Sequence, residues 1–199
     1  MLTTCGYLGL VLLGGLVISY ALWAYAWPRP ADPATPVILS AQILHPGLLR
    51  IHATVGALAL LVGLAQAGPW RRRMPLSWHR RAGYVYVSAV LISGLAGLWL
   101  ARSAEGGRLA QWGFGSLAVL WLGTTAWGVR SAIRGEAAAH RRAMVRSLAL
   151  ACAGIMLRVQ LPLCGLAGWE FAASYPWAAW TCWVPNLVFA DYLLRRNEL

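Results

Sequence analysis

A histidine followed by two arginines and an alanine occurs twice in the chain. His79-Arg80-Arg81-Ala82 is repeated 61 positions later as His140-Arg141-Arg142-Ala143. Each copy ends an arginine-rich segment and is followed by an apolar run long enough to cross a bilayer. Two imidazoles and four guanidinium groups are therefore expected at one membrane face. Imidazole nitrogens are axial ligands of haem iron and arginines bind haem propionates, so these residues are candidates for a haem site.

The same residues allow a second interpretation, in which they only bind lipid. A histidine beside two arginines at a membrane surface can face the phosphate headgroups of anionic phospholipid. Gly83 follows His79 by one helical turn, and a residue without a Cβ leaves a gap beside the imidazole on the same helix face. A flat macrocycle would fit such a gap, but close helix packing through small residues would use the same glycine. Both interpretations stay open at this stage.

Two further histidines lie toward the other side of the membrane. His45 and His52 are seven residues apart and share one helix face, with about 10.5 Å of helical rise between them. One metal ion cannot bind both, because its ligand bonds are only ~2 Å long. Gly56 follows His52 by one turn, in the same spacing as Gly83 after His79.

Arg158 lies inside the fifth apolar run, at a depth similar to that of His52. It either extends outward toward Glu170 at the membrane surface or faces a polar interior. An interior site would suit an anionic or carbonyl-bearing ligand, for instance a quinone headgroup. The predicted ligand-binding residues of this outer pocket are His45, His52, Gly56, Arg158, Gln160 and Asn186.

Composition indicates that membrane-spanning helices carry these residues. The chain of 199 residues is 59% hydrophobic and only 12% charged, about half the charge of a soluble domain. Six apolar runs are long enough to be transmembrane helices. We expect one all-α membrane domain over residues 1–199, a bundle with a core from the second to fifth helices. The expected spans are 7–27, 45–67, 82–101, 110–130, 143–165 and 174–194.

Charge distribution predicts how the bundle is oriented. The net charge of +11 comes from arginines that cluster in the loop 68–81, in the segment leading into the fifth span and in the C-terminal tail. The loops 28–44, 102–109 and 166–173 carry few arginines, diluted by acids. Both termini are therefore expected in the cytoplasm of a bacterium, with the protein in its cytoplasmic membrane. The basic loops favour anionic lipid as a partner rather than nucleic acid.

Other chemistries lack their residues in this sequence. It contains no HExxH, GxSxG or P-loop motif and no paired carboxylates. No CxxC occurs, so a zinc ribbon and a covalently attached c-type haem are both disfavoured. Cys164 and Cys182 fall toward the outer ends of their helices, where a disulfide is conceivable, but we expect buried free thiols. Asp191 is expected to pair with Arg195 one turn further on.

Several motifs together resemble a known family. They are His45-x6-His52, His79-Arg80-x2-Gly83-x-Val85-Tyr86, Gly113-Phe114-x2-Leu117-Ala118-x2-Trp121, His140-Arg141-x2-Met144-x-Arg146-Ser147, Leu157-Arg158 and Trp183-x-Pro185-Asn186. Over about residues 40–195 the chain resembles a family of predicted bacterial membrane proteins, domain of unknown function 2306. The resemblance implies a multi-pass membrane protein and supplies no activity.

A looser resemblance is to di-haem transmembrane cytochromes b of the ascorbate-reducing type. Those proteins have six helices and pair ligand histidines of helices two and four, and of helices three and five. His79 and His140 match the second pair, and His52 matches the helix-two position. The fourth span carries no histidine, so the resemblance implies at most one ordinary bis-histidine haem.

Two functional hypotheses follow, and whether the protein is an enzyme stays open. In the first it is a redox protein with haem b, or one linked to quinone, that works with a redox partner. In the second it is a non-haem transporter or small-ligand binding protein that uses the outer pocket. Discontinuous helices would favour the second hypothesis, with Pro162 and Pro185 as candidate breaks.

Overall fold

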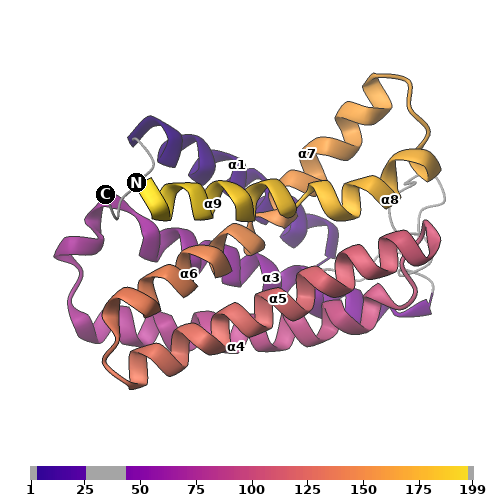
Figure 1. The fold of residues 1–199 in the computed structure, drawn as a ribbon. Coiled ribbons are helices and arrows are strands. Elements are labelled where there is room, and N and C mark those ends of the chain that lie inside the picture. The colour runs from indigo at the N-terminus through magenta and orange to yellow at the C-terminus, as the bar shows by residue number, and fades with distance from the viewer. Residues whose placement is uncertain (1–3, 26–43, 197–199) are drawn as a thin grey trace.

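A computed structural model of the protein describes residues 4–25 and 44–196. These residues form a bundle of helices (Figure 1). No β-strand occurs among these residues, which confirms the all-α prediction. A short 3-10 helix, η1 (Pro69–Arg73), connects the second and third expected spans. The α-helices are α1 (Thr4–Tyr25), α3 (Pro46–Ala67), α4 (Leu76–Ala101), α5 (Gly107–Ile133), α6 (Ala137–Ala151), α7 (Ala153–Leu166), α8 (Phe171–Thr181) and α9 (Val184–Arg196).

Four helical segments are long and apolar enough to cross a membrane. They are Cys5–Tyr25, Pro46–Ala67, Leu76–Ala101 and Ala137–Leu166. They correspond to the first, second, third and fifth expected spans. The fourth span corresponds to α5, which has 27 residues, and the sixth corresponds to α8 and α9 together. A membrane protein with several apolar helices is thus shown, while the count of six crossings stays a prediction.

The fifth and sixth spans are not single helices, which corrects the expected ranges 143–165 and 174–194. The fifth begins earlier, at Ala137, and is interrupted at Cys152, whose carbonyl accepts both Ile155 N–H at 3.0 Å and Met156 N–H at 3.1 Å. The sixth is interrupted between Thr181 and Val184.

The two prolines behave differently from each other at these interruptions. Pro162 lies inside α7, so the prediction of a break there is wrong. Pro185 is the second residue of α9 and follows the interruption of the sixth span directly. A proline in the first helical turn removes an N–H that has no partner within the helix, so it suits a helix start.

Consecutive helices pack side by side around one core. Helix α3 packs against α4, α4 against α5, and α5 against α6, while α1 covers α3, α8 covers α5 and α9 covers α6. This arrangement agrees with the expected core from the second to fifth spans. Tyr86 is the largest of the nearly inaccessible side chains, and it packs in a cluster with Val90, Trp121 and Leu150. Small residues such as Ala59 and Ala89 let the helices approach closely in the same cluster.

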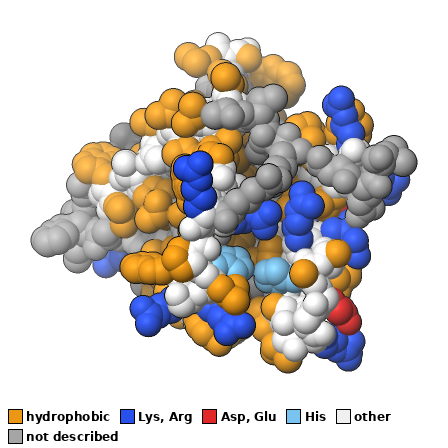
Figure 2. Space-filling view, turned by 90° about the vertical axis from the view of Figure 1, so that its left-hand side faces the viewer, with side chains coloured by type: hydrophobic (Ala, Val, Ile, Leu, Met, Phe, Trp, Pro, Cys, Tyr) orange, Lys and Arg blue, Asp and Glu red, His pale blue; other side chains and the backbone are white. Residues whose placement is uncertain are grey.

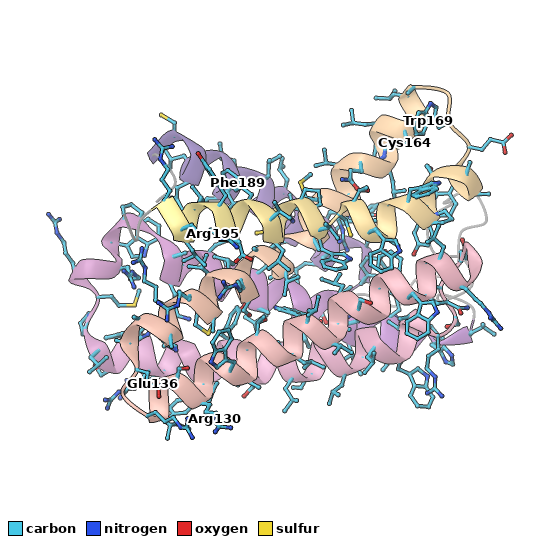
Figure 3. All side chains as sticks on the ribbon, viewed as in Figure 1. Arg130, Glu136, Cys164, Trp169, Phe189 and Arg195 are labelled. Atoms are coloured by element: carbon cyan, nitrogen blue, oxygen red, sulfur yellow. The ribbon has the colours of Figure 1, made fainter. Side chains whose placement is uncertain are left out.

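The two ends of the bundle differ in charge. Helix α1 begins, α9 ends, and both the α3–α4 and α5–α6 connections lie at one end of the molecule (Figure 1). Arg130, Glu136 and Arg195 lie at this end, whereas Cys164 and Trp169 lie at the other (Figure 3). We call the first the arginine-rich end, formed by η1, the first turns of α4 and α6, residues 134–136 and the last turn of α9. Its placement in the cytoplasm remains a prediction from the positive-inside rule.

Candidate functional site

His79 and His140 meet at the arginine-rich end. Each is the fourth residue of its helix, His79 of α4 and His140 of α6. Their backbone N–H groups donate to the residue before the helix, Pro75 O at 3.1 Å and Glu136 O at 2.9 Å. The two imidazole ring centroids lie 6.2 Å apart, with an angle of 80° between the ring planes. The repeated tetrapeptide thus places two equivalent side chains opposite each other.

Hydrogen bonding orients one imidazole of this pair and leaves the other incomplete. His140 Nδ1 lies 2.8 Å from Gly128 O of α5. A carbonyl only accepts, so Nδ1 carries the hydrogen, and in the neutral ring Nε2 has a free lone pair. His79 Nδ1 is buried and has no hydrogen-bond partner in the described part of the chain. A buried polar nitrogen without a partner is costly, which makes it a feature that a bound group could satisfy.

Arginines surround the pair at the surface. Figure 2 looks onto the arginine-rich end and shows two histidine side chains next to each other, with arginines around them. Arg80, Arg81 and Arg141 are exposed, and Arg142 is partly buried. A Cβ atom built on Gly83, one turn beyond His79, would meet nothing within 4 Å. The predicted open space beside this glycine is therefore present.

A cluster of hydroxyl groups lies deeper in the bundle below the pair. Tyr86 Oη lies 2.7 Å from Ser147 Oγ, and Ser147 Oγ lies 2.7 Å from Thr125 Oγ1. Tyr86 follows His79 by seven residues, which places it about 10.5 Å deeper along α4. Tyr86 and Ser147 are themselves 61 residues apart. Tyr86 and Ser147 are therefore a second pair of residues on α4 and α6, after His79 and His140, that are 61 positions apart and lie close together.

A cavity of about 190 Å³ lies nearer the other end, and we call it the His52 cavity. Its walls come from α1 and from α3 to α8. His52 Nδ1 lies 2.9 Å from Ser93 O of α4, while Ser93 Oγ donates to His52 O at 2.9 Å. This reciprocal pair fixes the imidazole. Gly97 allows the contact, because a Cβ there would lie 2.8 Å from His52 Cε1.

Arg158 lines the same cavity, which places it inside the bundle. Its Nη1 donates to Gly154 O at 3.0 Å, and its Cζ lies 5.9 Å from the ring centroid of Tyr20 in α1. Gly56 also lines the cavity, where a Cβ would lie 2.9 Å from Ser93 Oγ. Three of the six predicted pocket residues, His52, Gly56 and Arg158, are thus brought together.

The other three predicted pocket residues lie elsewhere. His45 precedes the first residue of α3 and is not part of the cavity wall. Gln160 Nε2 donates to Thr181 O at 3.1 Å. Asn186 Nδ2 donates to Ala149 O at 3.3 Å and to Cys182 O at 2.9 Å, and so connects the two interrupted spans. Sequence spacing could not predict where the Gln160 and Asn186 side chains point, because this depends on how α7 and α9 are rotated against their neighbours.

Sequence reasoning missed Ser93 and Trp121. Ser93 is fully buried and Trp121 is 7% exposed, and both line the His52 cavity. Trp121 Nε1 lies near the Tyr86 hydroxyl but makes no hydrogen bond of acceptable geometry with it. A buried serine in an apolar helix was the available signal, because such a hydroxyl needs a partner.

Several smaller expectations can now be compared with the structure. Asp191 pairs with Arg146 of α6, Nε to Oδ1 at 2.7 Å, so the expected pairing with Arg195 is wrong. Cys164 and Cys182 are free thiols, as expected; Cys182 is buried, but Cys164 is only partly buried, so the expected burial is wrong for Cys164. No group of three or more histidine, cysteine or acidic side chains that could hold a metal ion occurs among residues 4–25 and 44–196.

Comparison with known protein families decides the membership of the chain. The model of a family described as "Predicted membrane protein (DUF2306)" matches residues 49–194. The chain belongs to this family. The resemblance to it is confirmed, and His52, His79, His140 and Arg158 of this DUF2306 protein all lie inside the matched range.

Other comparisons add nothing to this assignment. Comparison with curated proteins and with solved structures finds no match for the DUF2306 protein. The looser resemblance to di-haem cytochromes b is therefore not supported. Helix α1 and His45 lie before the matched range, so Tyr20, which contacts Arg158, belongs to the part outside it.

Proposed function

We propose that this protein is a membrane redox protein with one b-type haem, bound between His79 and His140. The observation that supports the proposal most is the placement of two imidazoles from different helices opposite each other at the arginine-rich end. An iron ion between two imidazoles binds one nitrogen of each at about 2 Å, which implies ring centroids about 6 Å apart. The measured centroid separation of 6.2 Å agrees with this requirement.

The surroundings of the pair also fit a haem. Ligand histidines usually donate their second ring N–H to a carbonyl or carboxylate, and His140 does so with Gly128 O at 2.8 Å. Among the described residues the buried His79 Nδ1 has no such acceptor, and a propionate would provide one. Arg80, Arg81, Arg141 and Arg142 would bind the propionates.

The small number of metal-ligating side chains favours haem over a bare metal ion. Structural zinc needs four protein ligands and catalytic zinc three, and no such group occurs among the described residues. A porphyrin supplies four nitrogens itself, so two histidines complete the coordination. A haem held by His79 and His140 would supply reversible one-electron transfer.

The protein side chains would then have distinct tasks. His79 and His140 hold the group, and the exposed arginines keep its charged edge at the membrane surface. The hydroxyl cluster of Tyr86, Ser147 and Thr125 closes the bundle below it. The shallow position favours exchange of electrons with a partner protein at the same membrane face.

The visible spectrum of the purified protein tests this proposal. Protein from haem-supplemented cells is expected to show a Soret band, which His79→Ala and His140→Ala each remove. His45→Ala is the matched control, since His45 lies at the other end of the bundle, and it should retain the band. A colourless wild-type protein, or a band that both substitutions leave unchanged, would refute the assignment.

A second candidate function is transport of a small ligand without haem. The observation that favours it is that both helix interruptions lie beside the His52 cavity, since Ala151, Ala153 and Cys182 line its wall. Broken helices at the membrane centre are typical of transporter binding sites. This function predicts alternating access, so a cysteine at Gly154 should react with membrane-impermeant thiol reagents from either side of the membrane. Reaction from one side only would argue against transport.

A further inference from the structure

We propose that the His52 cavity binds the headgroup of a quinol, a single aromatic ring with oxygens at opposite ends. One hydroxyl donates to His52 Nε2, and the opposite oxygen accepts from the Arg158 guanidinium. This site is separate from the histidine pair at the arginine-rich end. The binding can be tested whether or not the protein holds a haem.

The size of the cavity selects a single ring. A cavity of roughly 150 Å³ in another protein is large enough to bind benzene, and the His52 cavity measures about 190 Å³. It therefore has room for one substituted ring. Phe114, Trp121 and Tyr175 contribute aromatic surface to its wall, which favours a flat apolar ring.

His52 offers an acceptor in a fixed position. Its Nδ1–H is used by Ser93 O at 2.9 Å, so in the neutral ring the nitrogen left for a ligand is Nε2 with its lone pair. The hydroxyl of Ser93 bonds back to the His52 carbonyl at 2.9 Å. Because both contacts already exist, the imidazole loses little freedom when a ligand binds. A ligand that matches Nε2 must carry a hydrogen-bond donor.

Arg158 requires a hydrogen-bond acceptor on the ligand. A guanidinium has five N–H donors, and among the described residues the carbonyl of Gly154 accepts from only one of its nitrogens. The Tyr20 ring contributes a further electrostatic contact, at 5.9 Å from Cζ. A charge inside a membrane bundle is costly unless it meets acceptors. A ligand oxygen in the cavity would provide one.

A quinol headgroup satisfies both requirements together. It donates through one hydroxyl and accepts through the other oxygen, whereas an inorganic anion has no apolar surface for the aromatic wall. A neutral ring can reach this position through the bilayer, and this route suits a cavity inside an apolar bundle.

Calorimetric titration of the detergent-solubilised full chain with trimethyl-1,4-hydroquinone tests the inference. The control ligand is the corresponding 1,4-dimethyl ether, which keeps the ring but cannot donate. We expect the hydroquinone to bind at least tenfold more tightly than the ether, because the ether leaves His52 Nε2 without a donor. Equal affinity for the two compounds, or no binding of the hydroquinone, would overturn the inference.

Protein variants give an independent measurement. His52→Phe and Arg158→Met should each weaken hydroquinone binding at least tenfold, whereas His45→Phe should leave it unchanged. An affinity that neither cavity variant alters would refute the site. If a cavity variant does not fold, the comparison of the two ligands on the wild-type protein still decides the question.

The double variant His79→Ala/His140→Ala separates this inference from the proposed function. We expect it to lose haem and to keep its affinity for the hydroquinone. A wild-type protein without a Soret band that binds the hydroquinone through His52 would refute the haem proposal alone. A protein with haem that does not distinguish hydroquinone from ether would refute the cavity assignment alone.

Discussion

The histidine pair at the arginine-rich end and the His52 cavity use the same side chain in different settings. At the arginine-rich end two imidazoles from α4 and α6 face each other at 6.2 Å, and arginines surround them at the surface. In the cavity one imidazole from α3 and one guanidinium from α7 belong to a wall that is mostly apolar. Both sites nevertheless orient an imidazole in the same way, because its Nδ1–H donates to a backbone carbonyl of a neighbouring helix.

This difference shows that a second histidine changes the kind of ligand that a site can bind. Two neighbouring imidazoles can hold one metal centre between them, whereas one imidazole together with a guanidinium matches a ligand with a donor and an acceptor. In the cavity the wall from α5 is formed by Phe114, Leu117, Ala118 and Trp121. None of these side chains can ligate iron as a histidine does. The bundle therefore has one site suited to haem and one suited to an organic ring.

Substituting the histidines of one site at a time and measuring haem content should give the largest effects. These variants test the contrast between the two sites most directly. The double variant His79→Ala/His140→Ala is expected to lose all haem absorbance, because both axial ligands are removed. His52→Phe should keep that absorbance, since the hydroxyl cluster of Tyr86, Ser147 and Thr125 lies between the two sites. Haem content by the pyridine haemochrome method measures both results. Loss of haem in His52→Phe would show that the two sites are not independent.

Helix packing should be less tolerant around the cavity than beside the pair. A Cβ on Gly113 would lie 2.9 Å from the backbone oxygen of Ala179, so Gly113→Ala must push α8 away from α5. We expect a cost of about 1–3 kcal/mol, as for other overpacked sites. Gly83→Ala is the matched control, because nothing lies within 4 Å of a Cβ there. It should be neutral or gain up to about 1 kcal/mol from helix propensity.

Thermal unfolding in detergent, followed by circular dichroism, measures both glycine variants. The protein is prepared without added haem, so that only packing is compared. If Gly83→Ala destabilised the protein as much as Gly113→Ala, the gap beside His79 would be filled in solution. The proposed position of the macrocycle would then be wrong.

The hydroxyl cluster between the two sites should contribute a moderate amount of stability. Ser147→Ala removes the hydrogen-bond partner of the Tyr86 hydroxyl and one of two partners of Thr125, whose Oγ1 also donates to Trp121 O at 2.8 Å. The change should cost about 1–3 kcal/mol, because the buried Tyr86 hydroxyl is left without that partner. Ser88→Ala is the control on an exposed face of α4. The same melting experiment compares them, and equal midpoints would show that water replaces the lost contacts.

The ion pair between Arg146 of α6 and Asp191 of α9 should have the smallest effect. Arg146 and Asp191 have side chains 24% and 37% exposed, so solvent and salt screen their attraction. Asp191→Asn is expected to cost no more than about 1 kcal/mol. Melting of wild type and variant in low and high salt checks this, since the difference should shrink as salt increases. A larger, salt-independent loss would indicate that Asp191 is sheltered and structurally important.

The sequence by itself determined the class of the protein and the location of its charges. Long apolar runs cannot remain in water, so the all-α membrane character and the arginine-rich end follow from composition alone. The exact repeat of His79 and His140 also marked two equivalent helix starts. The thiols of Cys164 and Cys182 were expected to be free, which the structure confirms.

Only the tertiary structure decided which side chains meet. A spacing of seven residues would place His45 and His52 on one face of a continuous helix. In the structure α3 begins at Pro46, so His45 lies before the helix and outside the cavity wall. Asn186 and Gln160 bond to carbonyls near the helix interruptions, and no local propensity predicts an interruption at Cys152. Direction and distance between helices depend on packing of all neighbours at once. For that reason only the folded bundle shows that Ser93 and Trp121 line the cavity and that the imidazoles of His79 and His140 lie close together.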